Sequence, residues 1–255
     1  MSRCTQPSST HLVLIPSYNP GLKIVDTVRT ALENWQPVWV IVDGSTDRSG
    51  EALIELQKRF SELRVIHLAT NSGKGAAVLT GMHAARSEGF RFALVMDSDG
   101  QHPSGRIAEL MKLSLDNPSA VILGEPDFGP DAPFNRKEGR RIGNWWANLE
   151  TLWGGIHDSL FGFRVYPIQE SIEVMESIRG GRGFDFDTEL AVRLYWRGVR
   201  PINVKVPVRY YSAAEGGTSH FHYFRDNLRL IKAHTFLFFG MLAHLPTIWR
   251  LRWRT

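Results

Sequence analysis

Short apolar runs alternate with amphipathic segments through the first half of the chain. The runs lie at 11–15, 38–42, 64–68, 92–96 and 120–123. The segments between them carry apolar residues at helical spacing, as in 23–34, 51–60 and 76–88. Strands and helices that alternate at this spacing predict a parallel sheet with helices packed against it. The chain is therefore predicted to be an α/β protein whose mostly parallel sheet is flanked by helices.

Length and charge limit the possible classes only loosely. The 255 residues suit one large domain or a domain with an appendage. A formal net charge of +4 is compatible with nucleic acid, anionic lipid or phosphorylated substrates, and does not choose among them. The single Cys4 excludes an internal disulfide framework and fits a reducing compartment. Residues 1–10 are polar, without the apolar core of a signal peptide.

The fourth apolar run ends in two carboxylates, Asp97 and Asp99, which are followed by Gly100 and Gln101. Ligands of open α/β sheets bind at the carboxyl ends of the strands. Two aspartates at i and i+2 on a turn can reach one hard cation, and Gln101 adds a neutral oxygen. Such oxygen ligands favour Mg²⁺ or Mn²⁺, and a cation of this kind usually holds nucleotide phosphates. The alternative is a capped turn in which Asp99 caps a helix that begins near Pro103.

Two other predicted strands also end in polar turns. Asp43 and Asp47 follow the second strand, where they could bind a ligand or cap the next helix, and capping is the expectation for Asp47. The third strand leads to the glycine-rich segment 71–75, which contains Lys74. This segment lacks the spacing of a Walker A motif. Its amides and lysine nevertheless lie beside a helix N-terminus, where anionic groups are favoured.

The second half of the chain begins with a segment rich in Pro, Asp and Gly, 125–133, which is predicted to be a mobile loop. A basic stretch, 135–141, precedes a predicted helix. That helix carries an apolar stripe of Ile142, Trp145, Trp146, Leu149, Leu152 and Trp153. The stripe could pack in the core or, because basic residues and tryptophans adjoin, lie at a membrane surface.

Further helices are predicted after Pro167 and from 184 to about 198, and a strand at 202–210. The tail, 221–255, is aromatic and basic. Its stretch without Lys or Arg, 235–249, is shorter than a bilayer-spanning helix and contains Pro246. We expect the tail to lie at a membrane interface with its basic residues on anionic headgroups. A docked C-terminal helix or an oligomer contact are the alternatives.

Five motifs, in order, resemble family 2 glycosyltransferases of the GT-A fold, most closely the polyprenyl-phosphate (dolichyl-phosphate) sugar synthase branch. They are 15–19, 42–47, 71–75 with Gly81, 97–102, and Asp158 with 162–164. The resemblance extends to about residue 230. It implies a GT-A domain at 1–220, with a nucleotide-sugar half at 11–124 and an acceptor half at 125–220, followed by a membrane-associating tail at 221–255. Val42 departs from the family, which often has an aspartate there, and this leaves Asp43 as the base-binding carboxylate.

The resemblance implies a nucleotide-diphosphate-sugar donor across the strand ends. The implied donor-binding residues are Pro16, Tyr18, Asn19, Asp43, Lys74 and Asp97. Asp97, Asp99 and Gln101 would hold Mg²⁺ or Mn²⁺ on the diphosphate, where the metal neutralises the charge of the leaving group and makes Asp99 catalytic. Attack from the opposite face would invert the anomeric centre.

The acceptor half leaves two chemistries open. A lipid phosphate is already anionic near neutral pH and needs cationic positioning. The candidate residues for that task are Arg136, Lys137, Arg140 and Arg141, and the resemblance adds Arg164 of the 162–164 motif as a substrate-binding residue. A hydroxyl acceptor requires a general base, for which Asp187 and Asp158 are the candidates. Asp187 could also simply compensate a helix dipole.

The leading hypothesis is a metal-dependent inverting transferase that moves a sugar to a lipid-linked acceptor. We expect a cytoplasmic protein that is peripherally bound to an anionic membrane surface. One alternative is transfer to a hydroxylated lipid or aryl compound, and another is a non-catalytic binding module tethered at the membrane. No nucleic-acid-binding motif is present, so nucleic acid is not an expected partner. The sequence does not predict an oligomeric state.

Overall fold

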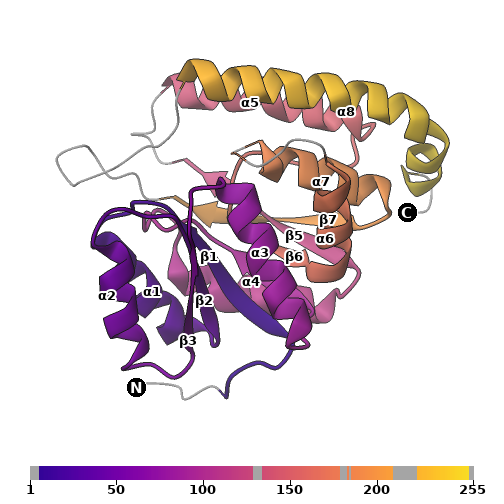
Figure 1. Ribbon diagram of the computed structural model, residues 1–255. Helices are drawn as coiled ribbons and strands as arrows, with labels where there is room; N and C mark the ends of the chain where they lie inside the picture. The colour runs from indigo at the N-terminus through magenta and orange to yellow at the C-terminus, as the bar shows by residue number, and fades with distance from the viewer. Residues whose placement is uncertain (1–5, 129–133, 179–182, 184, 209–222, 253–255) are drawn as a thin grey trace.

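The computed structural model describes residues 6–128, 134–178, 183, 185–208 and 223–252. Its centre is a seven-stranded sheet with the order β3-β2-β1-β4-β6-β5-β7 (Figure 1). The strands are β1 (His11–Ser17), β2 (Val38–Asp43), β3 (Leu63–Leu68), β4 (Phe92–Val95), β5 (Ala120–Asp127), β6 (Arg164–Pro167) and β7 (Arg200–Pro207). Only β6 runs antiparallel to its neighbours. The predicted α/β fold with a mostly parallel sheet is confirmed.

Helices cover both faces of this sheet. Before β5 they are α1 (Lys23–Asn34), α2 (Ser49–Gln57), α3 (Lys74–Ser87), the 3-10 turn η1 (Ser104–Arg106) and α4 (Ile107–Asp116). After β5 they are α5 (Phe134–Glu150), α6 (Ile168–Ser177), α7 (Phe186–Trp196) and α8 (Tyr223–Arg252). Helices α5 and α8 form an outer layer beyond α7 (Figure 1).

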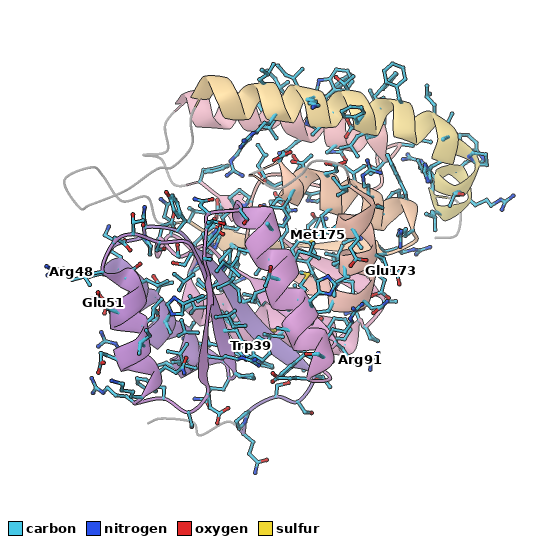
Figure 2. All side chains as sticks on the ribbon, viewed as in Figure 1. Trp39, Arg48, Glu51, Arg91, Glu173 and Met175 are labelled. Atoms are coloured by element: carbon cyan, nitrogen blue, oxygen red, sulfur yellow. The ribbon has the colours of Figure 1, made fainter. Side chains whose placement is uncertain are left out.

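The alternation of side chains along β1 divides the core in two. Leu12 and Leu14 pack with residues of α3, α6 and α7, whereas Val13 and Ile15 pack with residues of α1, α2 and α4. All seven residues of β1 are buried, as expected for a central strand covered on both faces. In Figure 2 the charged Arg48 and Glu51 lie at the outer edge, whereas the buried Trp39 and Met175 lie inside. The central strand β1 is therefore covered on both faces by the two halves of the core.

Three predicted boundaries in the second half need correction. The expected loop at 125–133 begins as strand, because Glu125–Asp127 continues β5 and pairs with Lys205–Pro207 of β7. Residues 129–133 lie outside the described residues. The predicted strand at 202–210 starts two residues earlier and ends at Pro207. Helix α5 begins at Phe134, so the basic stretch forms its first turns, consistent with the good helix propensity of Arg, Lys and Glu.

The tail forms one 30-residue helix, α8, with Pro246 inside it. One face docks on the core through Ala233, Leu237, Met241 and Ile248. A Cβ at Gly240 would lie 2.9 Å from the Trp196 ring, so this glycine lets the two helices approach closely. The alternative of a docked C-terminal helix is therefore confirmed for this face. Within the described residues, none of the helices combines the length and apolar character needed to cross a bilayer.

A buried histidine supports the opposite end of the sheet. The His11 imidazole stacks on Phe92 with ring centroids 4.5 Å apart and contacts Ser114 Oγ at 3.2 Å. Burial, together with the nearby Arg91 guanidinium, lowers the pKa of His11 from 6.5 to about 4. The folded protein therefore holds His11 neutral at pH values where an unfolded chain would protonate it.

We predict that His11 makes the fold acid-sensitive. The unfolded chain takes up a proton between pH 6.5 and about 4 that folded His11 does not, so stability should fall as the pH drops through this window. Removing the titrating group in His11→Gln should reduce the pH dependence of the unfolding free energy by on the order of 3 kcal/mol. Urea unfolding across this window measures it, with the exposed His67→Gln as control. An unchanged pH dependence in His11→Gln would contradict the assignment.

Candidate active site

The polar side chains predicted from the strand ends lie at one edge of the sheet. Strand β1 pairs with β2 on one side and β4 on the other, so the strand order reverses between β1 and β4. Ligands of open α/β sheets bind at such a reversal, beyond the carboxyl ends of the strands. Asp97 directly follows Met96 at this point, and Asp43 ends β2.

The centre of the site is an ion-pair triad of Asp97, Lys74 and Asp187. Lys74 Nζ lies 2.6 Å from Asp97 Oδ1 and 3.0 Å from Asp187 Oδ2. Burial disfavours the charged forms of both Lys74 and Asp97. The two carboxylates nevertheless raise the pKa of Lys74 above its ordinary value, and the Lys74 ammonium holds the pKa of Asp97 well below its usual range. Lys74 therefore links Asp97 of the donor half to Asp187 of the acceptor half.

His102 supports Asp97 from another side. The Asp97 backbone N–H donates to His102 Nδ1 at 3.0 Å, which places the proton of the neutral ring on Nε2. Nε2 then faces Asp97 Oδ2 at 3.6 Å. Burial lowers the pKa of His102 and favours this neutral form. His102 lies in the same motif as Asp97 and Asp99, but the residue pattern alone predicts no role for it.

The two carboxylates fit a divalent cation. Burial and the neighbouring Asp97 carboxylate raise the pKa of Asp99, because a second negative charge at this place is unfavourable unless a cation compensates it. Among the residues that the structure describes, no group of three or more His, Cys, Asp or Glu side chains forms a complete metal cluster. One or two carboxylates completed by substrate phosphates are the usual Mg²⁺ arrangement. Asp97 and Asp99 therefore fit a metal that is bound together with a diphosphate.

Gln101, the third predicted metal ligand, lies beside these carboxylates in sequence, and its backbone N–H donates to Asp99 Oδ1 at 3.0 Å. The residue also lines a surface groove of about 590 Å³, together with Thr30 and Asn34 of α1. The hydrogen bond that joins Gln101 to these carboxylates is therefore made by its backbone N–H.

Asp43 holds the glycine-rich turn in place. Its carboxylate is 2% exposed and accepts hydrogen bonds from the backbone N–H groups of Ser72 and Gly73, both at 2.8 Å. The next residue, Gly44, has a φ of +63°, and a Cβ there would lie 2.4 Å from the Asn71 nitrogen. Since Lys74 begins α3 directly after this turn, Asp43 positions the lysine.

Asn19 joins the turns after β1 and β2. Its side-chain Oδ1 accepts from the backbone N–H groups of Thr46 and Asp47 at 2.7 and 3.2 Å. The Asp47 carboxylate accepts from the backbone N–H of Ser49, the first residue of α2, although Arg48 and not Asp47 occupies the N-cap position. Tyr18 is 38% exposed at this edge, whereas Pro16 is buried within β1.

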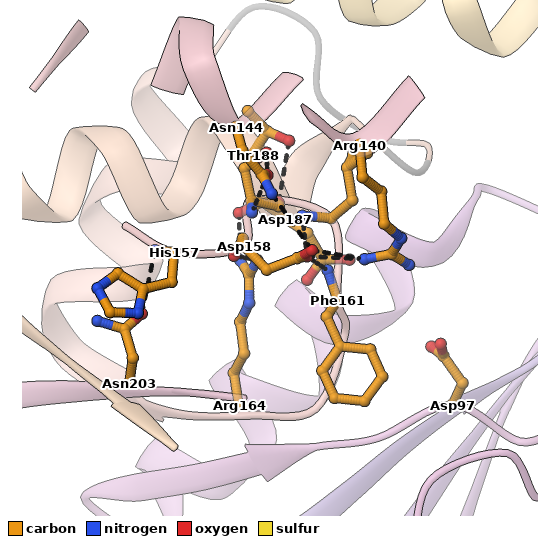
Figure 3. Close-up of polar contacts among 12 residues, drawn as sticks. Asp97, Arg140, Asn144, His157, Asp158, Phe161, Arg164, Asp187, Thr188 and Asn203 are labelled. Carbon is orange, nitrogen blue, oxygen red and sulfur yellow. Dashed lines mark hydrogen bonds and ion pairs between the residues drawn. The ribbon is translucent and has the colours of Figure 1, made fainter. Parts of the chain in front are cut away.

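Asp158, one of the two candidate bases, is engaged on all sides. Its carboxylate oxygens accept from Arg140 at 2.7 and 2.9 Å, and Oδ1 also accepts from the backbone of Leu160 and Phe161 (Figure 3). The residue is 3% exposed. A carboxylate with these partners positions the loop 158–163 and the first turns of α5, rather than meeting a substrate proton.

The structure corrects the prediction that Arg164 binds substrate. The residue is fully buried, and its guanidinium donates to the carbonyl oxygens of Asp187 at 2.5 Å and Asp158 at 3.0 Å (Figure 3). It also donates to Tyr166 Oη at 3.1 Å, and that hydroxyl donates to Asp187 Oδ1 at 3.2 Å. Arg164 therefore holds together two segments of the acceptor half, the one at Asp158 and the one at Asp187.

The remaining predicted cations lie on α5. The Arg140 side chain is 23% exposed beside Asp158, and Arg141 is exposed. The side chain of Arg136 lies outside the described residues. Asp187 is 1% exposed and paired as above, so both candidate bases are buried.

Gly162 lies against the centre of the triad. A Cβ there would be 2.6 Å from Lys74 Nζ and 3.3 Å from both Asp97 carboxylate oxygens. Two carboxylates hold this ammonium, so it cannot withdraw without lengthening an ion pair. Only the close approach in the folded protein explains why this position of the predicted 162–164 motif is glycine.

We predict that Gly162→Ala destabilises the protein by about 1–3 kcal/mol, because the added methyl group crowds a buried ion pair. Urea unfolding measures the loss. Gly105→Ala is the matched control, since a Cβ at Gly105 meets nothing within 4 Å. If both variants unfold at the same urea concentration, Gly162 does not crowd the triad.

Comparison with known proteins gives a family and a fold. Residues 12–183 match the family model described as glycosyl transferase family 2. The chain is 24% identical to a dolichyl-phosphate β-glucosyltransferase, ALG5D, of Trichomonas vaginalis over 70% of its own length, and it spans only 59% of that protein. It is 26% identical to the polyprenol monophosphomannose synthase of Mycolicibacterium smegmatis, over 79% of this chain and 78% of that one.

A solved structure supports the same fold. Glucosyl-3-phosphoglycerate synthase of Mycobacterium tuberculosis, determined with Mn²⁺, UDP and glucosyl-3-phosphoglycerate, superposes with a TM-score of 0.57 at 16% identity. The superposition covers 82% of this chain and 75% of that chain. The likeness extends well beyond the donor half of the sheet.

Proposed function

Because the chain belongs to glycosyl transferase family 2, we propose that it transfers a sugar from a nucleotide-diphosphate-sugar donor to a polyprenyl-phosphate-like lipid at the cytoplasmic face of a membrane. The names of the relatives support this acceptor class, since one acts on dolichyl phosphate and another makes a polyprenol monophosphomannose.

On the donor side, Asp97 and Asp99 would hold Mg²⁺ or Mn²⁺ on the diphosphate. The Mn²⁺ and UDP in the M. tuberculosis structure are consistent with this assignment. The metal would supply charge neutralisation for the departing nucleoside diphosphate. Lys74 adds a positive charge beside it, and Tyr18 and Asn19 border the same edge of the sheet. An acceptor that attacks from the opposite face inverts the anomeric centre.

The observation that carries the choice of acceptor is the pairing of both candidate bases. Asp187 is bound to Lys74, and Asp158 is bound to Arg140. A hydroxyl acceptor needs a free base within hydrogen-bond reach, whereas a phosphate acceptor arrives already deprotonated and needs cations. Arg141, which is exposed on α5, is suited to that task, whereas Arg140 is already paired with Asp158. The geometry therefore favours a lipid phosphate over a hydroxylated lipid or aryl compound.

The outer helices provide a surface for the lipid. The exposed large apolar side chains of α5 and α8 are Ile142, Trp145, Leu228, Ile231, Phe236, Phe239, Leu242 and Trp249. On α5, Trp145 of the predicted stripe is 51% exposed and Ala147 is buried, whereas the stripe residue Leu152, beyond the helix end at Glu150, packs against the core. Both helices lie in the same outer layer (Figure 1). We assign this surface, with the basic residues of α8, to the interface of an anionic membrane.

We predict that Asp99→Ala reduces transfer at least about a hundredfold, because the metal loses a ligand that neutralises the leaving group. The assay mixes the protein with radiolabelled nucleotide sugars, a membrane lipid extract and Mg²⁺ or Mn²⁺, and follows label into the organic phase. Asp116→Ala, at an exposed position on α4, is the control. Label that moves only to a hydroxylated acceptor would replace the lipid-phosphate proposal. Donor binding without any transfer would point to a non-lipid acceptor, and no binding of any donor would support the tethered binding module.

We also predict that Trp145→Ser combined with Phe239→Ser lowers binding to anionic vesicles about tenfold or more, because two large side chains no longer enter the interface. Co-sedimentation with vesicles that contain anionic lipid measures this. Leu115→Ser removes an equally exposed apolar side chain from α4 and serves as control. Unchanged sedimentation of the double variant would move the membrane surface elsewhere.

A further inference from the structure

The triad at the centre of the site is asymmetric. The Asp187 side chain is buried, with 2% exposed, and its Oδ1 accepts a hydrogen bond from the Tyr166 hydroxyl. The Asp97 side chain is 33% exposed and faces the edge where ligands of such sheets bind. Lys74, itself 13% exposed, lies between the two. One end of the triad is thus fixed in the core, and the other end is open.

We propose that Lys74 is a resident counter-ion of the metal site, which occupies Asp97 in the donor-free protein and yields this carboxylate when a divalent cation arrives with its diphosphate. Asp187 keeps the lysine in the site during this exchange. The inference rests on the proposed function only in taking Asp97 as a metal ligand. It makes Lys74 and Asp187 positioning residues that set metal affinity without contacting the metal.

The geometry provides room for such an exchange. Lys74 Nζ is at 2.6 Å from Asp97 Oδ1, a contact that a metal on the same oxygen must displace. Because Gly162 has no Cβ, no side chain from this residue presses on the ammonium, whereas a Cβ there would lie 2.6 Å from Nζ. The diphosphate oxygens that accompany the metal offer the displaced ammonium a new anionic partner. Metal and donor should therefore bind together more favourably than the metal alone.

Two variants should shift metal affinity in opposite directions. Lys74→Met removes the competing cation, so Mn²⁺ should bind the donor-free protein about tenfold more tightly. Asp187→Asn removes the second partner of the lysine, which then pairs more strongly with Asp97, so Mn²⁺ should bind severalfold more weakly. If Lys74 only stabilised the fold, both variants would weaken Mn²⁺ binding by disturbing the structure, and the two shifts in affinity would not be opposite.

The measurement is a titration of free Mn²⁺ by electron paramagnetic resonance, without donor. Lys74→Arg, which keeps the charge, should stay near wild type. Lys58→Met makes the same change in net charge at an exposed position on the C-terminal side of α2 and should also bind as wild type does. Lys74→Met leaves Asp187 buried without its cation, so Lys74→Met combined with Asp187→Asn is measured too. This double variant should also bind Mn²⁺ more tightly than wild type.

The outcomes separate this inference from the proposed function. Asp99→Ala should abolish Mn²⁺ binding, so that the signal of the free ion stays undiminished, and if it does not, the ion binds elsewhere and both the metal site and the role of Lys74 are overturned. If Asp99→Ala abolishes binding but neither Lys74→Met nor the double variant binds more tightly, only the counter-ion role is overturned. Opposite shifts in Lys74→Met and Asp187→Asn, with wild-type binding in Lys58→Met, would establish it.

Discussion

The site depends on the pairing of buried charge. Arg164 has no exposed surface, and its guanidinium joins the carbonyl oxygens of Asp158 and Asp187. That contact fixes the start of α7, and so the Asp187 carboxylate, which in turn holds Lys74 beside Asp97. Removing one partner of a buried pair typically costs about 3–5 kcal/mol, because the other charge is left uncompensated. The position of Asp97 at the edge of the sheet is therefore set by groups deep in the acceptor half as much as by its own strand.

The sequence was most informative where structure is local. The periods of the apolar runs predicted β1 to β4 and the helices between them, because each element shows its own pattern. The ends of the predicted strands then located Asp43 and Asp97. The turn after each carboxylate was predicted from the order of the elements along the chain. The motif resemblance added the family, which the comparisons confirm. What local patterns could not predict is that the reversed strand β6, only four residues long, lies between β4 and β5.

Roles that depend on distant partners were beyond the sequence. Asp158 and Asp187 were equivalent candidates for a base until their partners were known, and Lys74 lies 113 residues from Asp187. Arg164 was assigned to substrate as part of the 162–164 motif, whereas the fold buries it. The outer layer shows the same limit. The apolar positions on α5 and α8 were visible, but only the docked structure separates Ala147 and Leu237, which face inward, from Trp145 and Phe239, which do not.

The short reversed strand also constrains the order in which the protein can assemble during synthesis. Strands β1 to β4 pair among themselves, so the parallel half of the sheet can form once the chain reaches Val95. Strand β5 is made next, yet it joins that half only through β6, some forty residues later. Until Pro167 has been made, the hydrogen-bonding edge of β4 stays open. An open edge is a template for pairing with other chains, so nascent protein is most exposed to aggregation in this interval.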